Sequence, residues 1–139
     1  MNPCRVILYH KQATSAWLRF LRFANHSVCA FEPLPKLSVL MDEVPERVLV
    51  LHPAPIIRDA EQQLGLNPGD LEAEGEYQEM VDVAGGPINI LLARFTSIDP
   101  PFDLAERLQG RFIDLPDARD LMDTELLLLR KAYELLIGD

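Results

Sequence analysis

Short apolar runs alternate with turn residues along this chain, which is typical of a domain that mixes strands and helices. Four of the runs are rich in the aliphatic and aromatic residues that strands favour. We predict strands at residues 4–9, 27–31, 76–83 and 88–95. The last two are joined by Ala84-Gly-Gly-Pro87, a Gly-containing loop of hairpin length, so we expect them to pair antiparallel.

Residues 16–23 fit the periodicity of either element. A strand would place one set of alternate residues on a single face, whereas a helix gathers another set, spaced three or four residues apart, into one stripe. The strand set is Trp17, Arg19, Leu21 and Phe23, and the helix set is Trp17, Phe20, Leu21 and Ala24. The helix separates Arg19 and Arg22 from the apolar stripe better than the strand does. We therefore predict a helix here.

An amphipathic helix is predicted over residues 56–65, ending at Gly65 as helices commonly end at a glycine. Residues 58–66 read Arg-Asp-Ala-Glu-Gln-Gln-Leu-Gly-Leu. This stretch resembles the second half of the Nudix box, whose pattern is Arg-Glu-aliphatic-x-Glu-Glu-x-Gly-aliphatic. The positions that fit or nearly fit are Arg58, Asp59, Ala60, Gly65 and Leu66. Gln62 and Gln63 stand where the family has two glutamates.

Other parts of the chain limit or extend the resemblance. Val44 and Val50 replace the Gly and Glu of the first half of the box, and residues 46–52 resemble a buried strand. Downstream, a loop with two prolines, an aromatic strand, a Leu-x-x-Ala turn and a closing helix follow in the order that the family would supply. The resemblance covers residues 56–137. It implies an α/β fold of the α+β type, with a mixed sheet between helices.

The two glutamines bear on the chemistry that the resemblance implies. In the family, the paired carboxylates bind the divalent metal that drives diphosphate cleavage. Gln carries no charge and has one carbonyl oxygen beside an NH₂ donor, whereas Mg²⁺ prefers several oxygen ligands. Asp59 is then the one carboxylate on this helical face, because Glu61 turns about 100° away. We predict no catalytic residue, metal or cofactor, and a remnant binding site at Arg58, Asp59, Gln62 and Gln63.

A different placement of carboxylates keeps hydrolysis open. Glu72, Glu74 and Glu76 would share one face of an extended segment and form a displaced metal site. The other interpretation is a solvated sheet edge that charge protects from aggregation. His52 either points into the same cleft as the box helix or makes a structural hydrogen bond. The alternative function is an active hydrolase of nucleoside diphosphate derivatives with relocated metal-binding carboxylates.

Composition and charge set the outer limits. The 139 residues suffice for a single domain over 1–139. A net charge of −9 opposes nucleic acid and anionic membranes as main partners. No apolar run approaches the roughly 20 residues of a spanning helix, and the start lacks the pattern of a signal peptide. We expect a cytoplasmic protein in which Cys4 and Cys29 are reduced.

The last predicted helix, residues 123–137, has an apolar arc broader than one sheet face normally covers. One stripe contains Leu126, Leu129, Tyr133 and Leu136, and a second contains Leu128, Ala132 and Leu135. This arc is either buried within the chain or forms the contact of a homodimer. Together these patterns predict a Nudix-like domain without metal-dependent hydrolysis, which binds a small, nucleotide-like molecule or a protein partner.

Overall fold

Eight strands and three helices make up the part of the chain that the computed structural model describes, residues 4–41 and 52–137. The strands are β1 (Cys4–Lys11), β2 (Leu18–Arg22), β3 (Cys29–Ala30), β4 (Val39–Leu40), β5 (Leu71–Ala73), β6 (Glu79–Asp82), β7 (Ile88–Phe95) and β8 (Arg111–Ile113). The helices are α1 (Pro53–Leu64), α2 (Phe102–Arg107) and α3 (Asp123–Ile137), and a short 3-10 helix, η2 (Leu115–Ala118), precedes α3. None of these described helices is long and apolar enough to cross a membrane.

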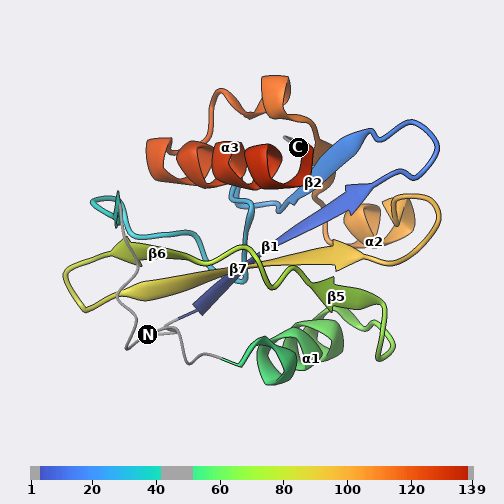
Figure 1. Ribbon diagram of the computed structural model, residues 1–139, viewed down its shortest axis with the longest axis horizontal. Helices are drawn as coiled ribbons and strands as arrows, with labels where there is room; N and C mark the ends of the chain where they lie inside the picture. The colour runs from blue at the N-terminus through green and yellow to red at the C-terminus, as the bar shows by residue number, and fades with distance from the viewer. Residues whose placement is uncertain (1–3, 42–51, 138–139) are drawn as a thin grey trace.

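The eight strands form one mixed sheet that lies between helices (Figure 1). Along its main path the strand order is β4-β6-β7-β1-β2-β8, while β3 pairs with β1 and β5 pairs with β7. The central strands β1 and β7 are parallel, with Val6 opposite Leu91. The other pairs are antiparallel. The predicted α/β fold with a mixed sheet between helices is thus confirmed.

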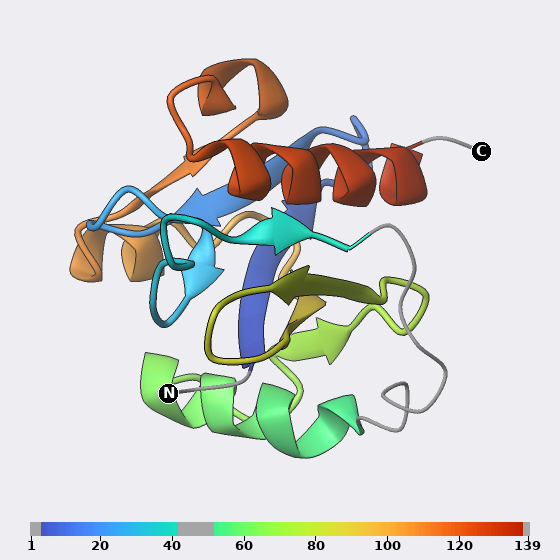
Figure 2. The ribbon, with the colours of Figure 1, turned by 90° about the vertical axis from the view of Figure 1, so that its left-hand side faces the viewer.

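Different helices cover the two faces of the sheet, α3 on one side and α1 on the other (Figure 2). Alternate residues of β1 enter separate cores. Ile7 and Tyr9 belong to the core beneath α3, whereas Val6 and Leu8 belong to the core beneath α1. A strand that is buried on both faces has a nearly continuous apolar run, which in β1 only the buried Arg5 and His10 interrupt before the final Lys11. The strand predicted at residues 4–9 is confirmed.

The helix predicted at residues 16–23 is wrong, because β2 occupies this segment. Phe20 is buried in the core beneath α3 and Leu21 in the core beneath α1. A strand covered on both sides shows no clean alternation of apolar and polar residues, so its sequence is easily confused with that of a helix. Arg22 is 4% exposed and donates to both carboxylate oxygens of Asp120, at 3.0 and 3.1 Å.

The elements that carry the sequence resemblance are otherwise present. Helix α1 ends at Gly65, whose backbone is left-handed (φ 73°) and whose N–H donates to the carbonyl of Gln62 at 3.1 Å. Strands β6 and β7 pair antiparallel, with Met80 opposite Asn89. Helix α2, which the sequence did not predict, directly follows the loop with two prolines. The strand predicted at residues 46–52 falls, except for its last residue, outside the described residues.

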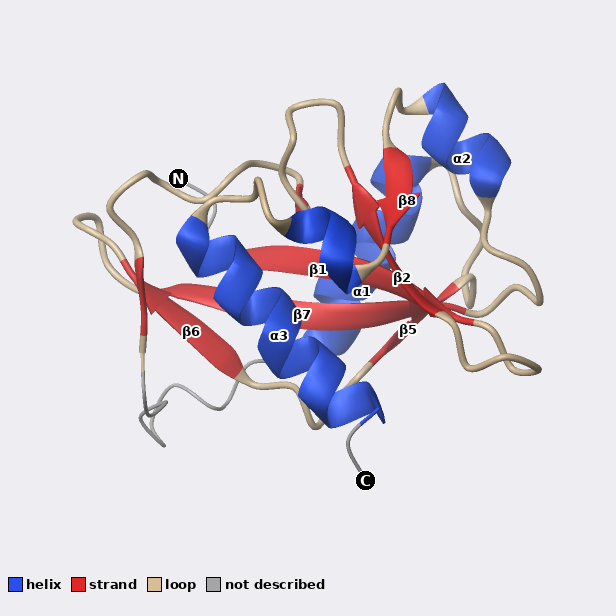
Figure 3. Ribbon diagram, turned by 90° about the horizontal axis from the view of Figure 1, so that it is seen from above, coloured by secondary structure: helices blue, strands red, loops and turns tan. Residues whose placement is uncertain are grey.

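The broad apolar arc of α3 is largely used within the chain. Leu128 and Ala132 have no exposed surface, and Leu135 packs partly buried against the same core. Figure 3 shows α3 lying across the sheet. Burial within the chain therefore accounts for the second stripe, and a homodimer stays a prediction. The large apolar side chains that α3 leaves exposed are Leu127, Tyr133 and Ile137.

Candidate functional site

Helix α1 carries the face on which the sequence places the candidate site. Pro53 begins the helix, where its missing N–H is not needed. The side of α1 that packs against the sheet has buried apolar residues at helical spacing, Ile57, Ala60 and Leu64. At the other end, Arg107 of α2 donates to the carbonyl of Leu64 at 2.6 Å, which satisfies one of the carbonyls left free at a helix terminus. The helix is thus held by its buried face and by its C-terminal end.

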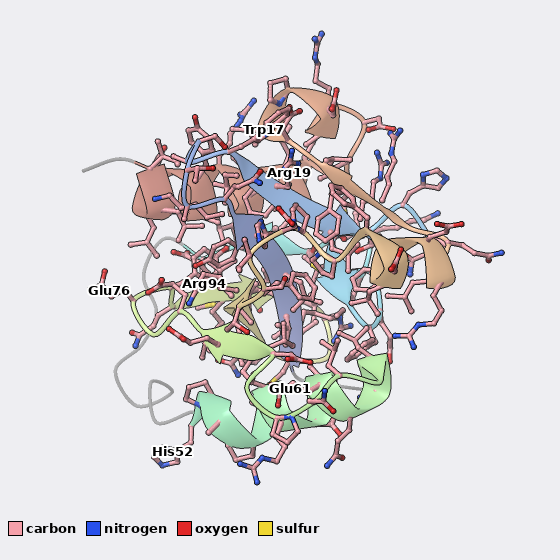
Figure 4. The ribbon with its side chains drawn as sticks, turned by 90° about the vertical axis from the view of Figure 1, so that its right-hand side faces the viewer. Trp17, Arg19, His52, Glu61, Glu76 and Arg94 are labelled. Carbon is pink, nitrogen blue, oxygen red and sulfur yellow. The ribbon has the colours of Figure 1, made fainter. Side chains whose placement is uncertain are left out.

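Glu61 organises the loop that follows α1. Its side chain is buried, and its Oε2 accepts hydrogen bonds from the backbone N–H groups of Gly69 at 2.8 Å and Leu71 at 3.0 Å. Figure 4 shows Glu61 on α1, far from Trp17 and Arg19 at the opposite end of the molecule. A charged acceptor makes strong bonds of this kind. Glu61 is therefore a structural residue, and its carboxylate is not available to join Asp59.

A groove beside α1 contains two of the four predicted site residues. In it, Nε2 of Gln63 donates to Oδ2 of Asp59 at 2.7 Å across one helical turn. One hollow, of about 320 Å³, is lined by Cys4, Val6, Ala30, Phe31, Pro55, Ile56, Asp59, Ala60 and Gln63. A second, of about 310 Å³, is lined by Phe23, Ala24, Asn25, Phe31, Gln63, Leu64 and Leu108. Phe31 and Gln63 line both hollows, which therefore adjoin and are together termed the α1 groove.

The α1 groove is mostly apolar and carries one charged side chain, that of Asp59. Among the residues that the structure describes, no Lys, Arg or His lines either hollow. Burial raises the pKa of the Cys4 thiol above its usual value, an effect that Arg5 partly offsets. The thiol is consequently neutral at neutral pH, and the groove carries a single negative charge.

The remaining predicted residues lie outside the groove. Arg58 and Gln62 are exposed and line neither hollow. His52 stands just before α1, makes no capping hydrogen bond with its side chain, and points away from the body of the protein in Figure 4. The sequence did not identify Phe31 and Ile56 as groove residues. Their meeting depends on how the chain after β3 approaches α1, for which no local sequence signal exists.

The displaced metal site considered at Glu72, Glu74 and Glu76 is not formed. The chain does not stay extended, because the carbonyl of Glu74 accepts a hydrogen bond of 3.1 Å from the backbone N–H three residues later. Glu72 pairs with Arg94 of the neighbouring strand β7 at 3.4 Å, and Figure 4 shows Glu76 at the surface. In the described part of the chain, no three His, Cys, Asp or Glu side chains are grouped so as to hold a metal ion.

A larger hollow, of about 700 Å³, lies between the region just before β6 and the end of α3. Its charged lining residues are Glu76, Glu79, Lys131 and Glu134. Burial raises the pKa of Glu79, and Lys131 partly offsets the effect. Among them Glu76 was a sequence candidate, in the displaced metal site that is not formed, whereas the α1 groove contains Asp59 and Gln63 of the box. The α1 groove is therefore the candidate site.

An exposed aromatic cluster lies near the turn between β1 and β2. Trp17 is 51% exposed and Phe102 is 55% exposed. The guanidinium of Arg19 lies 4.1 Å from the ring centre of Trp17 and 5.8 Å from that of Phe102. Trp17 and Arg19 lie together at the opposite end of the molecule from α1 in Figure 4. The incorrect helix prediction concealed this cluster, because it assigned Trp17 to an apolar stripe separate from Arg19.

Comparison with known proteins identifies the fold. No family model matches the sequence, and no curated protein matches it. The structure is similar to the crystal structure of the C. elegans Ap4A hydrolase, with a TM-score of 0.51 and 18% sequence identity. The alignment covers 98% of this chain and 99% of that chain. At this identity the likeness concerns the fold alone, and it supports a Nudix-like fold for this chain.

Proposed function

We propose that this chain is a Nudix-like domain that binds a small molecule in the α1 groove and lacks metal-dependent diphosphate hydrolysis. The observation that carries the proposal is the hydrogen bond of 2.7 Å from the Gln63 amide to the Asp59 carboxylate. The family motif has carboxylates at the positions of Gln62 and Gln63. An amide donor beside Asp59 takes up acceptor capacity that a divalent ion would use.

Magnesium binding needs more oxygen ligands than this face offers. Mg²⁺ demands near-octahedral oxygen coordination and is usually held through carboxylates. Asp59 supplies one carboxylate, which already accepts the Gln63 amide, and Glu61 is bonded to the backbone of the following loop. Without the ion there is no Lewis acid and no metal-activated water to attack a diphosphate.

The size and lining of the α1 groove support a small-molecule ligand. Ligand sites are commonly hollows of roughly 300–1,000 Å³ with mostly apolar walls and a few polar groups. The first hollow, of about 320 Å³, has Val6, Phe31 and Ile56 in its wall and the Asp59–Gln63 pair as its polar group. The ring of Phe31 provides a surface on which a planar ligand can stack. The planar base of a nucleotide-like molecule is accordingly the ligand part that we expect there.

Binding to another protein is the second candidate function, and the aromatic cluster favours it. Trp and Arg are enriched at protein interfaces, and Trp17 and Arg19 are stacked on the surface here. Ile98 is 88% exposed and adds apolar surface. Its neighbour Asp99 accepts a hydrogen bond from the side chain of Gln12, which connects this loop to the end of β1. The partner includes a second copy of this chain, which would then associate through a surface other than the α3 arc considered for the predicted homodimer. Trp17→Ala should then weaken association in sedimentation velocity and leave the α1 groove unaffected.

A hydrolysis assay tests the principal proposal. Purified protein is incubated with Mg²⁺ and either Ap4A or ADP-ribose, and product is followed by chromatography. We expect product to appear at the rate of the buffer alone, because the helix face lacks the metal ligands. Asp59→Asn is the matched variant and should leave that rate unchanged. Turnover that requires Mg²⁺ and disappears in the Asp59→Asn variant would contradict the proposal.

A further inference from the structure

We infer that the α1 groove selects a neutral or cationic molecule with an apolar body and an N–H donor, and that it rejects a polyphosphate. The inference rests on the proposed small-molecule binding and specifies the chemistry of the ligand. Three features of the groove support it: the single carboxylate, the absence of lining cations among the described residues, and the apolar wall that contains Phe31.

The charge of the groove opposes an anionic ligand. Asp59 is the one carboxylate among the lining residues. Arg107 donates to the carbonyl of Leu64 at 2.6 Å, and the buried Arg5 donates to the carbonyl of Glu32 at 2.8 Å, so both guanidinium groups are held by backbone carbonyls and neither side chain lines a hollow. An anion in the groove meets the like charge of Asp59 and no cationic lining side chain, whereas a cation meets its complement.

The geometry at Asp59 favours a hydrogen-bond donor. Gln63 binds Oδ2 and holds the carboxylate against α1, while Oδ1 accepts no hydrogen bond from the described residues. An ammonium, amidine or amine N–H supplies that donor, and charge-assisted bonds of this kind are stronger than neutral ones. A fully ionised phosphate oxygen is only an acceptor and cannot complete the site.

The remaining wall fits the apolar part of such a ligand. The rings of Phe31 and Phe23 lie 6.3 Å apart between centres, tilted by 54°, and form aromatic surface across the two hollows. An aromatic ring near Phe31 places a short amine arm within the first hollow, which Asp59 also lines. A polyphosphate has no apolar part to bury, and in this hollow it would lose water without gaining partners.

Two indole compounds of opposite charge test the selection. Tryptamine carries an ammonium group and indole-3-acetate a carboxylate on the same ring, and inorganic tripolyphosphate without metal serves as the polyphosphate. Titrations of the ¹⁵N-labelled full chain follow the backbone signals of Phe31, Ile56 and Asp59 by NMR. We expect tryptamine to shift these signals saturably and to bind at least about tenfold more tightly than indole-3-acetate. Tripolyphosphate should leave them unchanged.

Two variants separate charge from other effects. Asp59→Asn keeps the shape of the side chain and removes its charge, so the preference for tryptamine should fall to about twofold or less. Asp82→Asn is the matched control, because Asp82 is an exposed carboxylate at the end of β6 and lines neither hollow. It should leave both affinities unchanged.

The outcomes distinguish this inference from the proposed function. If indole-3-acetate binds as tightly as tryptamine, if tripolyphosphate shifts the groove signals, or if the tryptamine preference survives Asp59→Asn, the charge selection is wrong while small-molecule binding stands. If none of the three probes shifts the groove signals saturably at millimolar concentration, both the selection and the proposed binding are wrong.

Discussion

Replacing Glu61 removes the acceptor that holds the loop between α1 and β5. The buried Oε2 of Glu61 accepts the N–H of Gly69 at 2.8 Å and that of Leu71 at 3.0 Å. Gly69 is exposed, so water can bind its N–H after the change, but Leu71 is buried and its N–H has no access to water. The main cost of Glu61→Ala therefore arises at Leu71.

The magnitude follows from these two bonds. A hydrogen bond to a charged group contributes about 1.5–3 kcal/mol, and a buried group left without a partner costs about 1–3 kcal/mol. We expect Glu61→Ala to lower the free energy of unfolding by about 2–4 kcal/mol. Glu61→Gln keeps an oxygen acceptor in nearly the same place, and it should cost only about 1 kcal/mol.

Urea denaturation measures both variants through the linear dependence of the unfolding free energy on denaturant. Gln62→Ala is the control, because Gln62 is the exposed neighbour on the same helix and should change stability by less than about 0.5 kcal/mol. Hydrogen exchange at the amide of Leu71 should also accelerate in Glu61→Ala. Equal stability of Glu61→Ala and Gln62→Ala would refute the role assigned to Glu61.

Two further predictions concern α3 and the buried Arg22. Leu128→Ala should lower the free energy of unfolding in urea by about 2–5 kcal/mol, because the side chain is fully buried. Leu127→Ala, at an exposed position, should change that free energy by less than about 0.5 kcal/mol. Similar losses at both positions would contradict the packing of α3. Arg22 holds the pKa of the Asp120 carboxyl below its usual value, mainly through their hydrogen bonds. A carboxyl whose pKa is lower in the folded state stabilises the fold fully at pH values above its unfolded-state pKa. This stabilisation is lost as pH falls through the folded-state pKa. The difference in Tm between wild type and Asp120→Asn should therefore shrink as pH falls below about 4, and a difference that is constant with pH would disprove the link.

The sequence predicted best those elements whose signals are local. Gly65 marks the end of α1 because a left-handed residue is needed there, and its φ is 73°. The Gly-containing loop at residues 84–87 indicates the hairpin of β6 and β7. The long apolar arc at residues 123–137 matches the bounds of α3, since a helix that packs deeply shows its periodicity over several turns.

The elements that the sequence missed depend on contacts between distant segments. Residues 18–22 form a strand because β1 and β8 flank them and both faces are covered, conditions that a short window does not reveal. The α1 groove likewise requires Phe31 to meet α1. The resemblance to the box placed all four residues at the site. Asp59 and Gln63 line the groove, while Arg58 and Gln62 lie on the same helix but outside it.

Calorimetric titration with Mg²⁺ tests most directly whether the α1 face has lost its metal. The wild type should show no saturable heat at millimolar Mg²⁺, because Asp59 is the one carboxylate in the groove and it already accepts the Gln63 amide. The double variant Gln62→Glu, Gln63→Glu places three carboxylates at i, i+3 and i+4 on the helix and should bind the ion. Saturable Mg²⁺ binding by the wild type that Asp59→Asn abolishes would contradict the account.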